Sequence, residues 1–276
     1  MSMKYLLLLV LFVCLSCIEP NVKDMLGDDF RLYKHTPAWS LAKAVEDEDT
    51  TEISKQVLQM HIPVDYRDPK YKQTLLMLAT STNKIESVEK LLELGANPNA
   101  HDDSTKYFGE SAVLLACRFT RPSSKILALL LKYGGDPNST ACGVQEDGLG
   151  EIVPMREFAL SAAVFSSFEK VKLLVDAGAN INYATSTESC AIENCMIHDR
   201  MDIMLYLLQK GADYRRKFTE IDVDKPDYPT FEVDILYKLR KCVYPIGSKA
   251  YKEKMKVVYF LKKKGLDYWK SPIPSG

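Results

Sequence analysis

Apolar residues return at helical spacing in pairs of short runs along most of the chain. Between residues 73 and 99, a first apolar run covers 75–79, a polar turn follows, and a second run covers 85–92. Spacings near 3.6 residues in both runs predict two short amphipathic helices. Gly95 follows the second run and predicts its end, because glycine enters the left-handed cap conformation without steric cost. The predicted unit is therefore helix, turn, helix, glycine stop and an extended loop.

A short motif ends this unit and recurs along the chain. It reads Leu-Leu-x-x-Gly followed by Ala-Asn or a variant of it. Successive glycine stops lie 39, 44, 33 and 54 residues apart. One helix pair cannot bury its apolar face alone, whereas stacked pairs can, and this explains the repetition. The stops are Gly95, Gly134, Gly178, Gly211 and Gly265.

This pattern resembles the ankyrin repeat, whose usual period is 33 residues. Thr36-Pro37 is similar to the helix start of that family, and other units keep mainly the second helix and the glycine. The resemblance implies an all-α ankyrin-repeat solenoid of about six helix-turn-helix units, with long loop insertions at 139–153 and 215–233. The expected units cover residues 36–68, 69–102, 107–141, 154–187, 188–220 and 231–269.

The first residues differ from the rest, because Lys4 precedes an apolar run from Tyr5 to Leu15. This run is shorter than the ~20 residues of a membrane span, and it fits a signal peptide. Leu15-Ser16-Cys17 resembles the lipobox of bacterial lipoproteins, which implies a Cys17 acylated with chains such as palmitate; a plain, cleaved signal peptide is the alternative. Ile18 implies the periplasmic face of the outer membrane by that family's sorting rule.

The expected organisation is a signal peptide at 1–16, a lipidated tether and N-terminal cap at 17–35, an ankyrin-repeat domain at 36–269 and a C-terminal tail at 270–276.

Charge and cysteine content narrow the class of protein. Charged residues make up 26% of the chain and its formal net charge is −1, unlike a strongly cationic nucleic-acid binder. Five cysteines follow Cys17, an odd number, and the sequence leaves open whether Cys142 or any other forms a disulfide. Three of them, at 117, 190 and 195, fall in helical patterns, where cysteine acts as a small apolar residue.

Signatures of catalysis are sparse. Gly148-Leu149-Gly150 lacks the third glycine and the preceding strand of a phosphate-binding loop, so a turn is expected there. Cys195, His198 and Asp199 form the densest group of potential metal ligands, but a zinc site needs more ligands than lie nearby. The common hydrolase motifs are absent from the sequence. We expect no catalytic residues, no metal and no cofactor, and a chain that is not an enzyme.

Partner binding is the remaining expectation. In ankyrin arrays the loop tips and the exposed faces of the first helices line a groove in which partners dock. Exposed aromatic and arginine side chains are typical anchors of such interfaces, although any single aromatic residue can instead fill a gap between units. The residues placed at these positions are Tyr71, Tyr107, Phe108, Glu110, Arg118, Phe119, Met155, Arg156, Phe165, His198 and Arg200.

The resemblance also suggests a function. Ankyrin-repeat lipoproteins of this size resemble immunity proteins against type VI secretion effectors, notably phospholipases, so the implied partner is a secreted phospholipase effector. Two alternatives stay open. One is an envelope scaffold or stress-protection protein that holds an endogenous partner. The other is a metal-assisted enzyme using Cys195 and His198.

Overall fold

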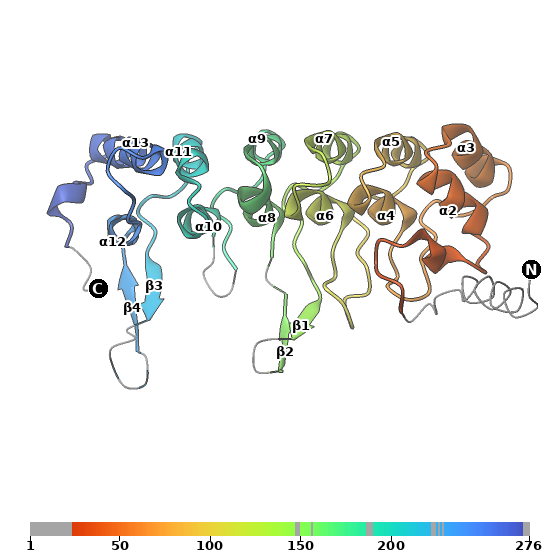
Figure 1. Ribbon diagram of the computed structural model, residues 1–276, viewed down its shortest axis with the longest axis horizontal. Helices are drawn as coiled ribbons and strands as arrows, with labels where there is room; N and C mark the ends of the chain where they lie inside the picture. Colours follow the sequence, from red (N-terminus) through yellow and green to blue (C-terminus); the bar gives the residue numbers. More distant parts are fainter. Residues whose placement is uncertain are drawn as a thin grey trace, which may run out of the picture.

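The computed structural model describes residues 24–146, 150–155, 157–185, 190–221, 225, 227 and 229–272. Helices in this part form six antiparallel pairs stacked side by side, with the first helix of each pair in one row and the second helix in the other (Figure 1). This arrangement confirms the predicted repeat solenoid. The pairs are α2 (Trp39–Glu46) with α3 (Thr50–Leu58), α4 (Leu75–Ser81) with α5 (Ile85–Glu93), α6 (Ala112–Arg118) with α7 (Ser124–Lys132), α8 (Ala159–Ser166) with α9 (Phe168–Asp176), α10 (Ala191–Ile197) with α11 (Met201–Gln209), and α12 (Ile235–Lys241) with α13 (Lys249–Lys263).

Local signals in the sequence explain where these helices begin and end. The Thr74 side chain accepts a hydrogen bond from the backbone amide of Met77 and caps α4, and Ser111 caps α6 in the same way. At the other end, Gly95 has a φ of +91° and its amide donates to the carbonyl of Leu92. The other four predicted glycine stops also have positive φ, so the stops are confirmed.

The two insertions form β-hairpins, whereas the sequence analysis expected loops. Strands β1 (Val144–Glu146) and β2 (Ile152–Pro154) pair antiparallel, as do β3 (Phe218–Ile221) and β4 (Thr230–Val233). Both hairpins project from the row of first helices, away from the row of second helices (Figure 1). Phe218 and Val233, which face each other across the second hairpin, are buried and attach it to the core.

Small residues let neighbouring units approach closely. Ala79, Ala116 and Ala163 lie at the same position of successive first helices and are completely buried. The loops after the glycine stops are joined by a ladder of hydrogen bonds in which an Asx side chain of one unit accepts from a backbone amide of the next. Its rungs are Asp65 to Asn97 (3.1 Å), Asn99 to Asp136 (2.7 Å), Asn138 to Asn180 (2.7 Å) and Asn182 to Asp213 (2.8 Å).

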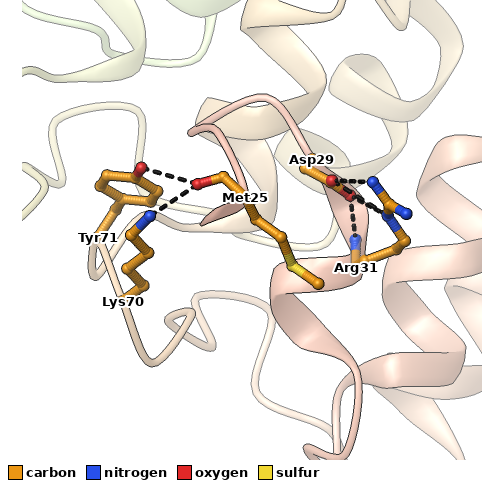
Figure 2. Close-up of polar contacts among 5 residues, drawn as sticks. All are labelled: Met25, Asp29, Arg31, Lys70 and Tyr71. Carbon is orange, nitrogen blue, oxygen red and sulfur yellow. Dashed lines mark hydrogen bonds and ion pairs between the residues drawn. The ribbon is translucent and has the colours of Figure 1, made fainter. Parts of the chain in front are cut away.

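The described start of the chain packs against the loop tip of the second unit. The backbone carbonyl of Met25 accepts hydrogen bonds from the Lys70 ammonium (2.7 Å) and the Tyr71 hydroxyl (3.0 Å), while Asp29 forms an ion pair with Arg31 (2.6 Å) at the start of η2 (Phe30–Tyr33) (Figure 2). The Met25 side chain is buried as well, so this segment is part of the packed solenoid.

Cys17 and the apolar run before it lie outside the described residues, so their predicted roles stay predictions. Within the described ranges, no helix combines the length and the apolar character that crossing a bilayer requires. The five cysteines in these ranges carry free thiols. As expected, those at 117, 190 and 195 are buried in the helical core, whereas Cys142 is exposed.

Candidate functional site

A groove of about 520 Å³ runs across the third, fourth and fifth units and is called here the central groove. Its walls come from α6, α8 and α10, from the residues that directly follow α6 and α10, from strand β1 and from the segment between β2 and α8. Three successive first helices thus supply side chains to one surface. The lining residues are Arg118, Phe119, Gln145, Met155, Glu157, Ser161, Ala162, Phe165, Asn194 and His198.

Arg118 is the central charged residue of this groove. It is the last residue of α6, and its guanidinium forms ion pairs with Glu110 (Nη1 to Oε1, 2.7 Å) and with Glu157 (Nε to Oε2, 3.0 Å). The same group lies over the Phe108 ring at 4.9 Å and near the Phe119 ring at 5.8 Å. One guanidinium therefore contacts two carboxylates through two different nitrogens and also lies against two aromatic rings.

Burial raises the pKa values of both carboxyl groups. Glu110 is 5% exposed, and desolvation raises its pKa to about 7 although the charge of Arg118 opposes the shift. Desolvation likewise raises the pKa of Glu157, again against Arg118. The Glu110 amide also donates to Asp102 Oδ1 (3.0 Å), whose pKa burial raises too. The charge of the half-buried Arg118 thus offsets only part of the desolvation cost of Glu110 and Glu157.

Three phenylalanine side chains remain open to solvent around this cluster. Phe108 is 41% exposed, Phe119 52% and Phe165 62%. The buried Lys170 ammonium donates to the Phe119 carbonyl (2.5 Å) and holds that backbone in place. The Phe165 ring lies edge-on to the His198 ring, with centroids 5.0 Å apart. These large apolar side chains are therefore held in position and left partly uncovered.

The hairpin is attached close to Phe108. The amides of Gly143 and Val144 donate to the carbonyls of Phe108 (2.9 Å) and Tyr107 (3.0 Å). A Cβ atom at Gly143 would lie 2.0 Å from the Tyr107 carbonyl oxygen, so only glycine allows this approach. The insertion is thus joined to the loop tip of the third unit and forms one side of the groove.

The structure brings together five of the predicted partner-binding residues, at positions 118, 119, 155, 165 and 198, as lining of the central groove. Phe108 covers Arg118 on the same surface. Glu110 lies behind Arg118 and is buried, so it contributes by holding that side chain.

Three other predicted residues make contacts within the chain. The Tyr71 and Tyr107 rings pack at 4.7 Å, and the Tyr71 hydroxyl is bound to the Met25 carbonyl. Arg200 donates to the Val164 carbonyl (2.9 Å) and pairs with Asp202 (3.3 Å). Arg156, also predicted to bind the partner, lies outside the described residues.

Sequence reasoning missed half of the lining. Glu157 and Asn194 carried weak signals, because one lies two residues after Met155 and the other lies one helical turn before His198. Gln145 carried no signal, since it reaches the groove only through the hairpin that was expected to be a loop.

The side chains considered as metal ligands make other contacts in the structure. Cys195 is completely buried, and burial holds the pKa of its thiol far above the usual value. Asp199 accepts a hydrogen bond from the Tyr244 hydroxyl (2.5 Å), and His198 packs on Phe165. Across the described residues, no three His, Cys, Asp or Glu side chains are grouped as a metal site requires.

The match to a family model agrees with this architecture. Residues 41–141 match the family model for ankyrin repeats in three copies. A solved structure, the ankyrin repeat protein EF0377, is 22% identical with a TM-score of 0.49, covering 63% of this chain and 82% of that one. No curated protein matched the sequence. The fold is an ankyrin-repeat solenoid, and ankyrin repeats are a module for protein–protein interaction.

Proposed function

We propose that this chain is a lipid-anchored periplasmic protein that binds and neutralises another protein, as an immunity protein against a type VI secretion phospholipase effector. The partner docks in the central groove. The observation that carries the proposal is the group of exposed phenylalanines fixed around Arg118 in that groove.

The groove has the composition of a binding hot spot. Hot spots are enriched in aromatic residues and arginine, and they lie in clusters surrounded by less important contacts. Phe119 and Phe165 are more than half exposed although they are large and apolar, so a partner that covers them removes much apolar surface from water. Arg118 is already oriented by Glu110 and Glu157, so little side-chain entropy is lost when it binds.

The cellular location in this proposal rests on the sequence. The apolar run after Lys4 and the lipobox-like Leu15-Ser16-Cys17 support export and acylation. A protein anchored at the periplasmic face of the outer membrane meets an incoming phospholipase before or at its lipid substrate. Covering the active-site cleft of such an enzyme, or the surface that contacts lipid, would be sufficient to protect the cell.

The experiment uses the product of the neighbouring reading frame as the candidate effector, with Phe119→Ala and Phe165→Ala combined in one variant. An immunity protein requires sub-nanomolar binding, roughly −12 kcal/mol or stronger. Loss of two hot-spot residues, at about 2 kcal/mol or more each, raises the dissociation constant about a thousandfold. The matched control combines Leu58→Ala and Met60→Ala, which also remove exposed apolar side chains but lie on the first unit.

We expect the groove variant to lose binding and protection of cells while its helical signal and melting temperature stay unchanged. The control variant should bind normally. Full binding by the groove variant would disprove the docking site. Loss of binding together with loss of fold would show that these phenylalanines belong to the core.

A further inference from the structure

The last helix differs from the second helices of all preceding pairs. Helix α13 has 15 residues, whereas α3, α5, α7, α9 and α11 have nine each. It lies at the end of the array opposite to the described start of the chain (Figure 1). Its exposed side chains follow spacings of three and four residues, so they share one face of the helix. We call this face the terminal basic stripe; it consists of Lys249, Lys252, Lys256, Tyr259 and Lys263.

Charge is concentrated strongly at this end of the protein. Residues 249–272 contain eight lysines and two acidic residues, a formal charge of +6, whereas the whole chain has −1. Lys256 pairs with Glu253 (2.9 Å), and Lys270 approaches Asp267 (4.0 Å). Among the residues that the structure describes, the ammonium groups at 249, 252 and 263 have no acidic side chain within salt-bridge distance. The stripe therefore keeps most of its positive charge.

Two exposed aromatic residues accompany these lysines. Tyr259 is 55% exposed and Trp269 is 50% exposed, and their ring centroids lie 6.0 Å apart. The Lys262 ammonium lies 5.2 Å from the Trp269 ring centroid. Tyrosine and tryptophan favour the boundary between water and lipid, because each has an apolar body and a polar tip. Lysines beside them can reach anionic headgroups while their methylene stems stay near the apolar layer.

A terminal unit of a solenoid needs a polar outer face for solubility, and lysines satisfy that need. Solubility alone does not explain why acidic residues are nearly absent from this face, or why a tryptophan and a tyrosine are exposed among the lysines. A face with basic residues and interfacial aromatics instead matches a surface of dense negative charge next to apolar material.

We propose that the terminal basic stripe, together with Trp269, binds the headgroups of an anionic phospholipid membrane. This surface lies on the sixth unit, whereas the central groove is built from the third to the fifth units. Membrane contact and partner binding are therefore separate properties, and one can be lost without the other.

The test measures sedimentation of the full chain with vesicles of phosphatidylcholine alone or mixed with phosphatidylglycerol. All proteins carry Cys17→Ser, so a lipid anchor contributes to none of them, and the N-terminal apolar run is common to all. One variant combines Lys252→Gln, Lys256→Gln and Lys263→Gln. Its matched control combines Lys125→Gln, Lys132→Gln and Lys172→Gln, three exposed lysines on α7 and α9 that remove the same charge.

We expect phosphatidylglycerol to increase binding of the parent protein and to shift to the blue the tryptophan emission, which comes from Trp39 and Trp269. Each lysine near an anionic surface contributes about fivefold in binding, so the stripe variant should lose roughly a hundredfold and the control should lose little. Salt should weaken the parent's binding, since charges are screened over ~10 Å at 0.1 M.

Equal binding to both kinds of vesicle, or equal losses in the two variants, would overturn the proposal and leave the stripe as a solvated cap. Binding of polyglutamate through the stripe, with no gain from phosphatidylglycerol, would overturn it in favour of an acidic polypeptide partner. In every case, binding to the effector candidate is measured in parallel, so failure of the central groove is recognised separately.

Discussion

Glu110 gives the most direct test of the electrostatics described for the central groove. Its carboxyl group is buried behind Arg118, and desolvation raises its pKa from 4.5 to about 7. The folded state therefore binds this proton more tightly than the unfolded state does. For such a group, the stabilisation is fully present below pH 4.5 and is lost as the pH rises through about 7.

The magnitude follows from the shift. One pKa unit corresponds to 1.36 kcal/mol, so a shift of this size makes the folded state about 3 kcal/mol less stable at pH 8 than at pH 4.5 through Glu110 alone. Replacing Glu110 by Gln removes the titration and keeps a carbonyl oxygen for Arg118. As the pH rises from 4.5 to 8, we expect the parent to lose about 3 kcal/mol more unfolding free energy than the Glu110→Gln variant loses.

The assay is urea unfolding followed by circular dichroism at several pH values between 4.5 and 8. Subtracting the parent's unfolding free energy from the variant's at each pH cancels the contribution of the other titrating groups. Glu89→Gln, a substitution of an exposed glutamate on α5, controls for the loss of one negative charge. A difference between Glu110→Gln and the parent that stays flat with pH would refute the reasoning. It would mean that Arg118 compensates the burial of this carboxylate in full.

Three further predictions concern other parts of the chain. Asn138→Ala removes one rung of the loop ladder and should lower the unfolding free energy by about 1 kcal/mol, measured by urea unfolding; an unchanged midpoint would show that water replaces this bond. In the folded protein a thiol reagent should modify Cys142 within minutes, whereas Cys117 and Cys195 react only after unfolding, because burial raises their thiol pKa values and blocks access; mass spectrometry of the labelled peptides decides. Cys17→Ser should release the protein from the membrane fraction, and continued acylation detected by mass spectrometry would contradict the lipobox interpretation.

The helices and their ends could be predicted from the sequence. The runs at 75–79 and 85–92 became α4 and α5 with ends displaced by two residues or fewer. Such agreement is expected, because helix periodicity, capping and glycine stops depend on residues within a few positions of one another. The hairpins were missed for the opposite reason. Their strands are short, and Phe218 is identified as a buried anchor only once it packs on neighbouring units.

The candidate site was predicted in part. Phe119, Phe165 and His198 were found from their position in the repeat, since every first helix presents its last turn to the same side. The repeat position could not distinguish Tyr71, which is bound by the N-terminal segment, from Phe165, which stays exposed. That distinction depends on chain segments that lie far apart in sequence.

The amino-acid sequence by itself determined the repeating unit, its stops and the number of helix pairs, because these follow from short-range spacing and from backbone preferences. Only the tertiary structure decided which charges meet. Arg118 contacts Glu110 and Glu157 from different segments, and the energy of that cluster depends on how deeply the stacked units bury it. Burial and long-range pairing are properties of the assembled solenoid, and no single repeat contains them.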